Sequence, residues 1–301
     1  MSSTASPSLV QLHGLDRSDR VQNYASVAKD VQRVQAALEA RGFKCRPSSA
    51  VGALFRKALV LSEQWEAKTA AQDVLALMHA DEALRIAHAV EAVLDDADAQ
   101  EAIRRITKSD MHLSTRQPSQ GKDALWELDL HLFLKVREVP VRLAEPDLVV
   151  QLPGLLGPFG LACKKVYSED SVDKQLQKGC RQLRAADVPG VVAFNLDDMT
   201  PAESLLNKPT RQAAMDYLYA LNMAFVERHR IAFQEAILRG RCDAILISTA
   251  VQADVEQMSP RFNRFTQLSL WTLDNASAGA RLRQAAFHRH IEGRPGPREG
   301  A

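Results

Sequence analysis

The sequence predicts an α/β protein in which helices flank a mixed sheet, with an all-helical region ahead of that sheet. Two observations predict this class. Glycine and proline are absent between Ala53 and Gln117, and apolar residues there recur at three- and four-residue steps, which is typical of amphipathic helices. From residue 139 onward, short apolar runs bounded by breakers alternate with two helical patterns, which is typical of strands and helices built around one sheet.

Composition excludes several classes of protein. The 301 residues suit one large domain or two small ones, and 46% apolar with 25% charged residues is ordinary globular composition. Lys plus Arg is 38 and Asp plus Glu is 37, so the net charge of +1 excludes a polybasic nucleic-acid coat. Any nucleic-acid site must therefore be a local cluster of cations. No apolar stretch approaches 18 residues, so we expect no membrane span.

The first part of the chain divides into a short flexible N-terminus, residues 1–20, and a helical region, residues 21–112. The start has no basic segment followed by an apolar one, so it does not have the pattern of a secretory signal. Residues 63–101 carry ten acids against Lys68 and Arg85, which is typical of a solvated acidic face. We expect this region to contact a protein partner or a second copy of the chain.

The cysteines favour a reducing compartment. They are scattered, without the clustered spacing of a zinc site: Cys45, Cys163, Cys180 and Cys242. Free thiols fit a cytoplasmic location.

The second part predicts the sheet. A polar linker is expected at residues 113–123, and the apolar segment 125–136 fits either a strand or a helix. The expected strands are 139–143, 147–152, 159–166, 190–196, 242–249 and 265–273, and the expected helices are 171–186 and 212–239. We place this α/β domain at residues 121–275 and a mostly disordered tail at 276–301.

The densest chemistry lies on two of these strands. Asp147 begins one strand, and Lys164 and Lys165 lie on the next strand, after a short turn. Two strands joined in this way can bring a carboxylate and a lysine to the same end of a sheet. A carboxylate can hold a hard divalent cation there, and a lysine can stabilise a developing oxyanion, which is the chemistry of metal-assisted phosphodiester hydrolysis.

The segments EPDLVV, FGLACKKVYS, KQLQKGCRQL and GVVAFNLDDM resemble the PD-(D/E)xK nuclease superfamily, whose fold is restriction-endonuclease-like. The closest resemblance is to uncharacterised bacterial members with an "IACKR"-type strand, and it covers roughly residues 121–275. It implies a nuclease that uses Mg²⁺ or Mn²⁺ and cuts DNA or, as in some members, RNA. By position, Glu127 matches the helix acid, Asp147 the strand acid, and Lys164 the catalytic lysine. Glu127 and Asp147 would then be metal ligands.

One position departs from the superfamily pattern. Ala162 stands where the second strand acid belongs, two residues before Lys164. Some members take this acid from the following helix, which offers Glu169, Asp170 and Asp173, and we expect Asp173 to be the third metal ligand. Gln182 resembles a polar residue of the same helix in family members. The alternative is a degenerate relative that has lost its metal and only binds nucleic acid or a protein partner. A third interpretation is that the chain is an unrelated α/β scaffold in a protein complex.

A basic stretch supports a polyanion as partner. Residues 161–184 hold six cations against three acids, and we expect the nucleic acid to contact Lys165, Lys174, Lys178 and Arg181. The same residues also allow plainer interpretations. Lys164 and Asp147 could form only a structural ion pair, and Glu127 could be an exposed acid on a helix.

Overall fold

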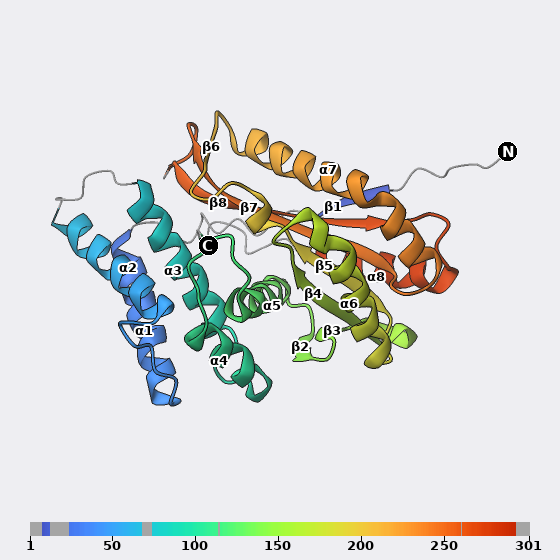
Figure 1. Cartoon of the computed structure of the whole chain (residues 1–301), viewed down its shortest axis with the longest axis horizontal. Coiled ribbons are helices and arrows are strands. Elements are labelled where there is room, and N and C mark those ends of the chain that lie inside the picture. The colour runs from blue at the N-terminus through green and yellow to red at the C-terminus, as the bar shows by residue number, and fades with distance from the viewer. Residues whose placement is uncertain (1–7, 13–23, 68–73, 114, 260, 293–301) are drawn as a thin grey trace.

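The computed structural model describes residues 8–12, 24–67, 74–113, 115–259 and 261–292 (Figure 1). Its helices are α1 (Tyr24–Ala40), α2 (Ala50–Glu66), α3 (Val74–Glu91), α4 (Gln100–Lys108), α5 (Gln120–Lys135), α6 (Val172–Ala185), α7 (Arg211–Leu238) and α8 (Ala278–Glu292). Its strands are β1 (Ser8–Leu12), β2 (Val141–Ala144), β3 (Asp147–Gln151), β4 (Pro158–Lys165), β5 (Gly190–Asn195), β6 (Leu205–Lys208), β7 (Ala244–Val255) and β8 (Phe262–Thr272).

The strands form one mixed sheet, as the sequence predicts. Its order is β1-β8-β7-β5-β4-β3-β2, and β6 pairs with β7 beside this path. The pairs β2–β3, β3–β4, β7–β8 and β1–β8 are antiparallel, whereas β4, β5 and β7 run parallel to one another. The carboxyl ends of β4, β5 and β7 therefore meet at the same edge, where ligands commonly bind in open α/β sheets.

Helices cover both faces of the sheet, which explains why β5 is buried along its whole length. Val192 and Phe194 face α6 and α7, and Val191 and Ala193 face α5. The Trp126 indole of α5 donates a 3.0 Å hydrogen bond to the carbonyl of Ala193.

The helical region packs on the sheet domain instead of standing apart. Its buried side chains, such as Val31, Phe55 and Ile86, belong to the same hydrophobic core as Leu128 of α5 and Leu148 of β3. Helix α3 contacts α5 directly, and Figure 1 shows α1 to α4 at one end of the sheet. The region therefore supplies side chains to the sheet edge.

Four expectations about local structure need correction. The segment 125–136, left open above, is helical and belongs to α5, which begins inside the expected linker because Ser119 Oγ accepts the N–H of Gly121 and caps it. Residues 8–12, expected to be flexible, form β1 on the free edge of β8. Strand β6 lacked an apolar signal and was missed.

The tail also differs from the expectation of disorder. Residues 278–292 form α8, because Phe287 and Ile291 are buried in the main core, with Phe287 5.2 Å from the Phe159 ring. Residues 293–301 of the expected tail lie outside the described residues.

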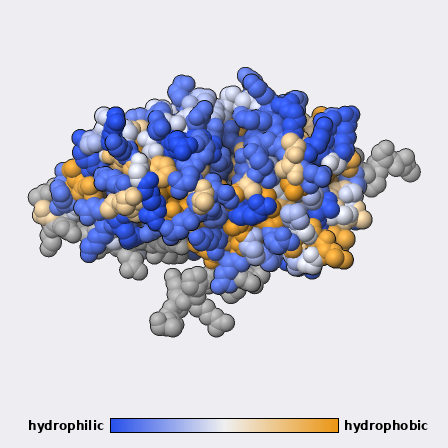
Figure 2. Space-filling view, turned by 90° about the horizontal axis from the view of Figure 1, so that it is seen from below, coloured by the Kyte–Doolittle hydropathy of each residue, from blue (hydrophilic) through white to orange (hydrophobic). Residues whose placement is uncertain are grey.

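No helix among the described residues has the length and apolarity needed to cross a bilayer. On the face seen in Figure 2, hydrophilic side chains predominate and hydrophobic ones gather in smaller patches between them.

Candidate functional site

Asp147 and Lys164 are brought together by the pairing of β3 with β4. Leu148 lies opposite Leu161, so Asp147 at the start of β3 lies beside Ala162 of β4. Lys164 Nζ is 3.0 Å from Asp147 Oδ2, and the N–H of Cys163 donates to the same oxygen at 2.7 Å. Lys164 Nζ also donates to the carbonyl of Cys163 at 2.5 Å. The sequence prediction that this carboxylate and this lysine meet is confirmed.

Glu127 lies near this pair but has its own cation. Arg105 of α4 binds the Glu127 carboxylate with two hydrogen bonds of 2.6 and 3.1 Å, the paired geometry that arginine favours. Burial raises the pKa of Glu127, Arg105 lowers it, and the negative charge of Asp147 raises it further. The two carboxylates are thus close enough to repel each other. Glu127 is neither exposed nor unpaired, so the interpretation as an exposed helix acid is wrong.

Burial raises the pKa of Asp147 as well, while Lys164 and the N–H of Cys163 act in the opposite direction. Gln182 of α6 completes the cluster. Its Nε2 donates to the carbonyl of Pro146 at 3.0 Å, and its buried Oε1 has no hydrogen-bond partner among the described residues. Gln182 Nε2 also donates to Asp147 Oδ1 at 3.5 Å, so this side chain reaches the strand acid.

The expected third acid does not join the cluster. Asp173 is exposed in the first turn of α6, nine residues before Gln182, which is about 14 Å along the helix axis. Glu169 pairs instead with Arg228 and His229 of α7, at 2.5 Å each, and Asp170 is exposed. The prediction that Asp173 compensates for Ala162 is wrong, because Asp173 lies in the first turn of α6 and the helix reaches Asp147 only near its other end, at Gln182.

The side chains present do not make a convincing set of metal ligands. Within the part of the chain that the structure describes, no group of three or more His, Cys, Asp and Glu side chains is placed to hold a metal ion. Of the three acids expected as metal ligands, Glu127 and Asp147 approach each other, and Arg105 and Lys164 already neutralise them. A hard cation such as Mg²⁺ would have to displace both cationic groups, so this arrangement does not fit a resident metal.

The expected nucleic-acid contacts separate into two places. Lys174, Lys178 and Arg181 are exposed on α6, spaced so that they share one face of the helix. Lys165 is buried instead, and its Nζ donates to Asn195 Oδ1 at 2.7 Å. Lys165 therefore does not present its charge to solvent with the α6 cations, because its side chain points to the face of the sheet opposite to that of Lys164.

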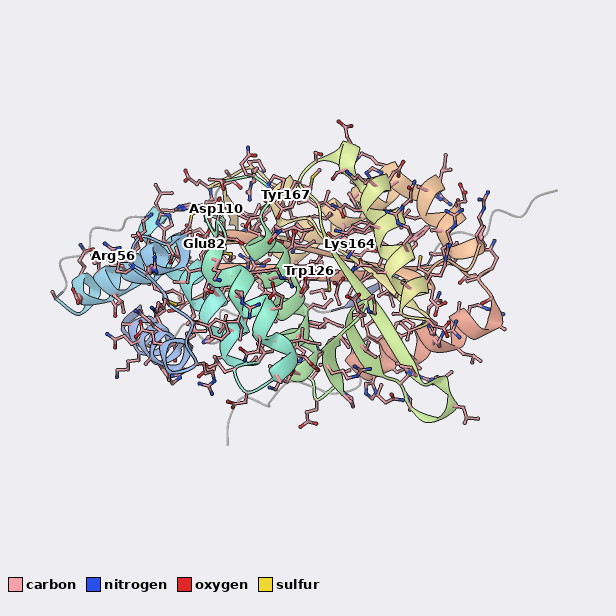
Figure 3. All side chains as sticks on the ribbon, turned by 60° about the horizontal axis from the view of Figure 1, so that its bottom comes forward. Arg56, Glu82, Asp110, Trp126, Lys164 and Tyr167 are labelled. Atoms are coloured by element: carbon pink, nitrogen blue, oxygen red, sulfur yellow. The ribbon has the colours of Figure 1, made fainter. Side chains whose placement is uncertain are left out.

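A second charged cluster was not predicted. Asp197, just after β5, accepts hydrogen bonds from Arg85 of α3 at 3.1 Å and from Arg264 of β8 at 2.9 Å. Arg85 also pairs with Asp129 of α5 at 2.5 Å. The sequence feature that could have predicted this cluster is the pair Asp197 and Asp198, which follows the buried strand directly. Figure 3 shows Glu82 of α3 and Lys164 well apart, with Trp126 and Tyr167 between them in that view.

Comparison with protein-family models, with curated proteins and with solved structures gives no match. The functional argument therefore depends on the geometry of this chain alone.

Proposed function

We propose that this protein binds nucleic acid through a nuclease-like core in which fixed cations have replaced the metal. The order of elements supports the resemblance to the PD-(D/E)xK superfamily. Helix α5, the antiparallel strands β2, β3 and β4, helix α6 and the parallel strand β5 follow one another as in the restriction-endonuclease-like core. Asp147 and Lys164 lie on its second and third strands, where the superfamily places its acid and its lysine.

The observation that carries the proposal is the pairing of both acids. Arg105 holds Glu127 by two hydrogen bonds, Lys164 holds Asp147, and the fully buried Ala162 contributes no carboxylate. These ion pairs oppose the rise in pKa that burial causes, so they favour the deprotonated carboxylates without a metal. The cluster then orders the strand ends and the adjoining α4 and α6, and the chain retains only the binding role.

The exposed face of α6 supports nucleic acid as the partner. Lys174, Lys178 and Arg181 present three cations to solvent on the helix whose Gln182 contacts the Asp147 cluster. Cations aligned in this way attract a phosphate backbone whatever its sequence. Binding of this kind weakens as salt rises, by a log–log slope of about 0.9 per phosphate contact on duplex DNA.

One observation favours a second candidate function, Mg²⁺- or Mn²⁺-dependent phosphodiester hydrolysis. Asp147 Oδ2 and the carbonyl oxygen of Cys163 converge on a single cation, the ammonium of Lys164. In the superfamily such oxygens hold a divalent ion, which would polarise the scissile phosphate and activate a water. This candidate requires the side chains of Lys164 and Arg105 to release both carboxylates when substrate binds.

The test incubates end-labelled duplex DNA, single-stranded DNA and RNA with the protein in Mg²⁺, in Mn²⁺ and in EDTA, and measures binding and cleavage in the same samples. We expect intact strands under all three conditions and the same salt-sensitive affinity with and without metal. The triple variant K174Q/K178Q/R181Q should weaken binding and lower the salt slope by up to about 0.9 per cation removed. Arg239→Gln, an exposed cation at the far end of α7, is the matched control.

Metal-dependent cleavage that Asp147→Asn abolishes would replace the proposal with the nuclease. Absence of binding to all three nucleic acids would reject both candidates and favour an unrelated α/β scaffold.

A further inference from the structure

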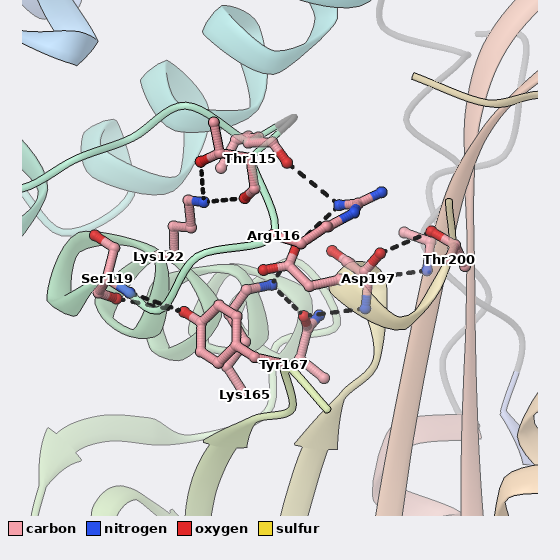
Figure 4. A network of polar contacts seen from close by, with 12 residues as sticks. Thr115, Arg116, Ser119, Lys122, Lys165, Tyr167, Asp197 and Thr200 are labelled. Carbon is pink, nitrogen blue, oxygen red and sulfur yellow. Dashed lines mark hydrogen bonds and ion pairs between the residues drawn. The ribbon is translucent and has the colours of Figure 1, made fainter. Parts of the chain in front are cut away.

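The second charged cluster surrounds a small cavity at the carboxyl ends of β4, β5 and β7. The cavity has a volume of about 70 Å³ and lies between α3, the loop before α5 and the loop after β5. Its cationic lining comes from four elements: Arg85, Arg116, Lys165 and Arg264. Figure 4 shows Arg116, Lys165 and Asp197 converging there, with Thr200 beside them.

Four carboxylates line the cavity, those of Glu82, Asp197, Asp198 and Glu203, and the two that follow β5 have unequal roles. Both carboxylate oxygens of Asp197 accept hydrogen bonds, Oδ2 from Arg85 and Arg264 and Oδ1 from the N–H of Ala250. Only one of the two carboxylate oxygens of Asp198 has partners among the described residues. Its Oδ1 faces Arg116 at 2.9 Å and Lys165 at 3.6 Å.

Two polar atoms at the cavity have no partner among the described residues. Asp198 Oδ2 is buried and accepts no hydrogen bond, although its side chain is only 3% exposed. Arg116 Nε is buried and donates none, while its Nη1 bonds to Asp198 and to the carbonyl of Leu113. A buried polar atom without a partner is costly, so the pair points to a missing group. That group must accept a hydrogen bond from a guanidinium and donate one to a carboxylate.

We propose that this cavity binds a protonated phosphate ion. Inorganic phosphate keeps at least one P–O–H group at neutral pH, so it donates to Asp198 Oδ2 while its other oxygens accept from Arg116 and Lys165. Sulfate has the same shape but no proton at this pH, so it meets the unpaired Asp198 oxygen as one anion meeting another. A site that hydrogen-bonds a hydroxyl rejects the analogue that lacks it.

The dimensions agree with a small ion. A volume of about 70 Å³ has room for several waters and therefore for a small ion. Exposed Pro201 and Glu203 form the rim, so the cavity reaches the surface. The terminal phosphate of a nucleoside monophosphate presents the same chemistry through that rim, but it is largely a dianion without a proton at pH 8. The inference is independent of nucleic-acid binding by α6.

Calorimetric titration at pH 8 with inorganic phosphate, sulfate and a nucleoside 5′-monophosphate tests the proposal. We expect phosphate to saturate one site per chain, with sulfate and the monophosphate at least tenfold weaker. Arg116→Gln should weaken phosphate at least tenfold, and Arg239→Gln should leave it unchanged. Equal affinity for phosphate and sulfate, no saturable phosphate binding, or an unchanged Arg116→Gln variant would overturn the proposal.

The variant Asp198→Asn tests the proposal through a gain of sulfate affinity, which a folding defect would not produce. Replacing the carboxylate with an amide removes the charge that repels sulfate and supplies an N–H donor. Sulfate should then bind at least as tightly as phosphate does. If this variant still discriminates against sulfate as strongly as the wild type does, Asp198 does not accept a hydrogen bond from the phosphate P–O–H group and the proposal fails.

Discussion

Lys164 and Lys165 are neighbours on β4, yet their surroundings differ in a way that separates two functions. Lys164 points toward Asp147 on the side of Gln182, where each cation has its own carboxylate. Lys165 points to the opposite face, where it shares a single oxygen of Asp198 with Arg116. Both clusters contain a buried guanidinium Nε without a partner among the described residues, but their carboxylates differ: those of Glu127 and Asp147 are fully paired, whereas Asp198 Oδ2 is not.

The comparison shows that the balance of partners decides what a buried charged cluster can bind. Glu127 and Asp147 are the residue types that hold a metal, but their cations leave no free ligand for one. Arg85 and Arg264 are paired in the same way with Asp197, but the neighbouring Asp198 still has a buried carboxylate oxygen without a partner among the described residues. The sequence pattern of Asp147 and Lys164 therefore locates the first cluster, and the ion pairs with Lys164 and Arg105 determine whether it can bind a metal.

The largest expected effect comes from breaking the complete part of the second cluster. Asp197→Asn leaves the buried Arg85 and Arg264 without their shared charge, so we expect a loss of about 3 kcal/mol in the free energy of unfolding, measured with urea. Asp254→Asn, which removes the partner of the exposed Arg261, is the control and should cost about 0–1 kcal/mol. Similar losses in both variants would contradict the assigned difference in burial.

The loss of stability in Asp197→Asn should depend on pH. Burial acts to raise the pKa of Asp197, but Arg85 and Arg264 outweigh burial and hold this pKa below its usual range. The stabilisation from a lowered carboxyl pKa is present above the unfolded value of about 3.9 and is lost as pH falls through the folded value. The difference between wild type and Asp197→Asn should therefore shrink below about pH 4.

A smaller effect is expected from breaking the first cluster. Lys164→Met leaves the Asp147 carboxylate with the Cys163 N–H but without its cation, so we expect a loss of about 2 kcal/mol. A double-mutant cycle with Asp147→Asn isolates the pair, and the double variant should be more stable than the sum of the two losses predicts. Strict additivity would mean that the two side chains are not a fixed pair.

These predictions depend on features that the sequence showed to different degrees. Runs such as GVVAFNL predicted their strands because β5 is apolar on both faces, and the proline before Asp147 marked the start of β3. The meeting of Asp147 with Lys164 was predictable because a short turn joins their strands.

Contacts that cross the fold were not predictable. Arg105 reaches Glu127 from α4, and Arg85 lies 112 residues from its partner Asp197. Both depend on how the helical region packs against the sheet, which no local periodicity encodes. The failure of Asp173 has the same origin, because its distance from Asp147 is set by the direction of α6 across the sheet.

The last expected effect depends on pH and concerns Glu82, which lines the cavity. Burial raises its pKa to about 7, Arg264 opposes this shift, and Asp81 adds to it. A raised carboxyl pKa gives stability that is full below about pH 4.3 and is lost as pH rises through about 7. Glu82→Gln should therefore gain up to about 3 kcal/mol over wild type at pH 8 and nothing at pH 4, in urea unfolding. A gain that is equal at both pH values would contradict the assigned titration.

Mn²⁺ binding, measured by electron paramagnetic resonance of the free ion during titration, tests the central claim most directly. If Arg105 and Lys164 have taken the place of the metal, the wild-type protein and Asp147→Asn should deplete free Mn²⁺ equally, without a stoichiometric site. One Mn²⁺ bound per wild-type chain and lost in Asp147→Asn would show that the first cluster is still a metal site, and the assignment of the two clusters would be wrong.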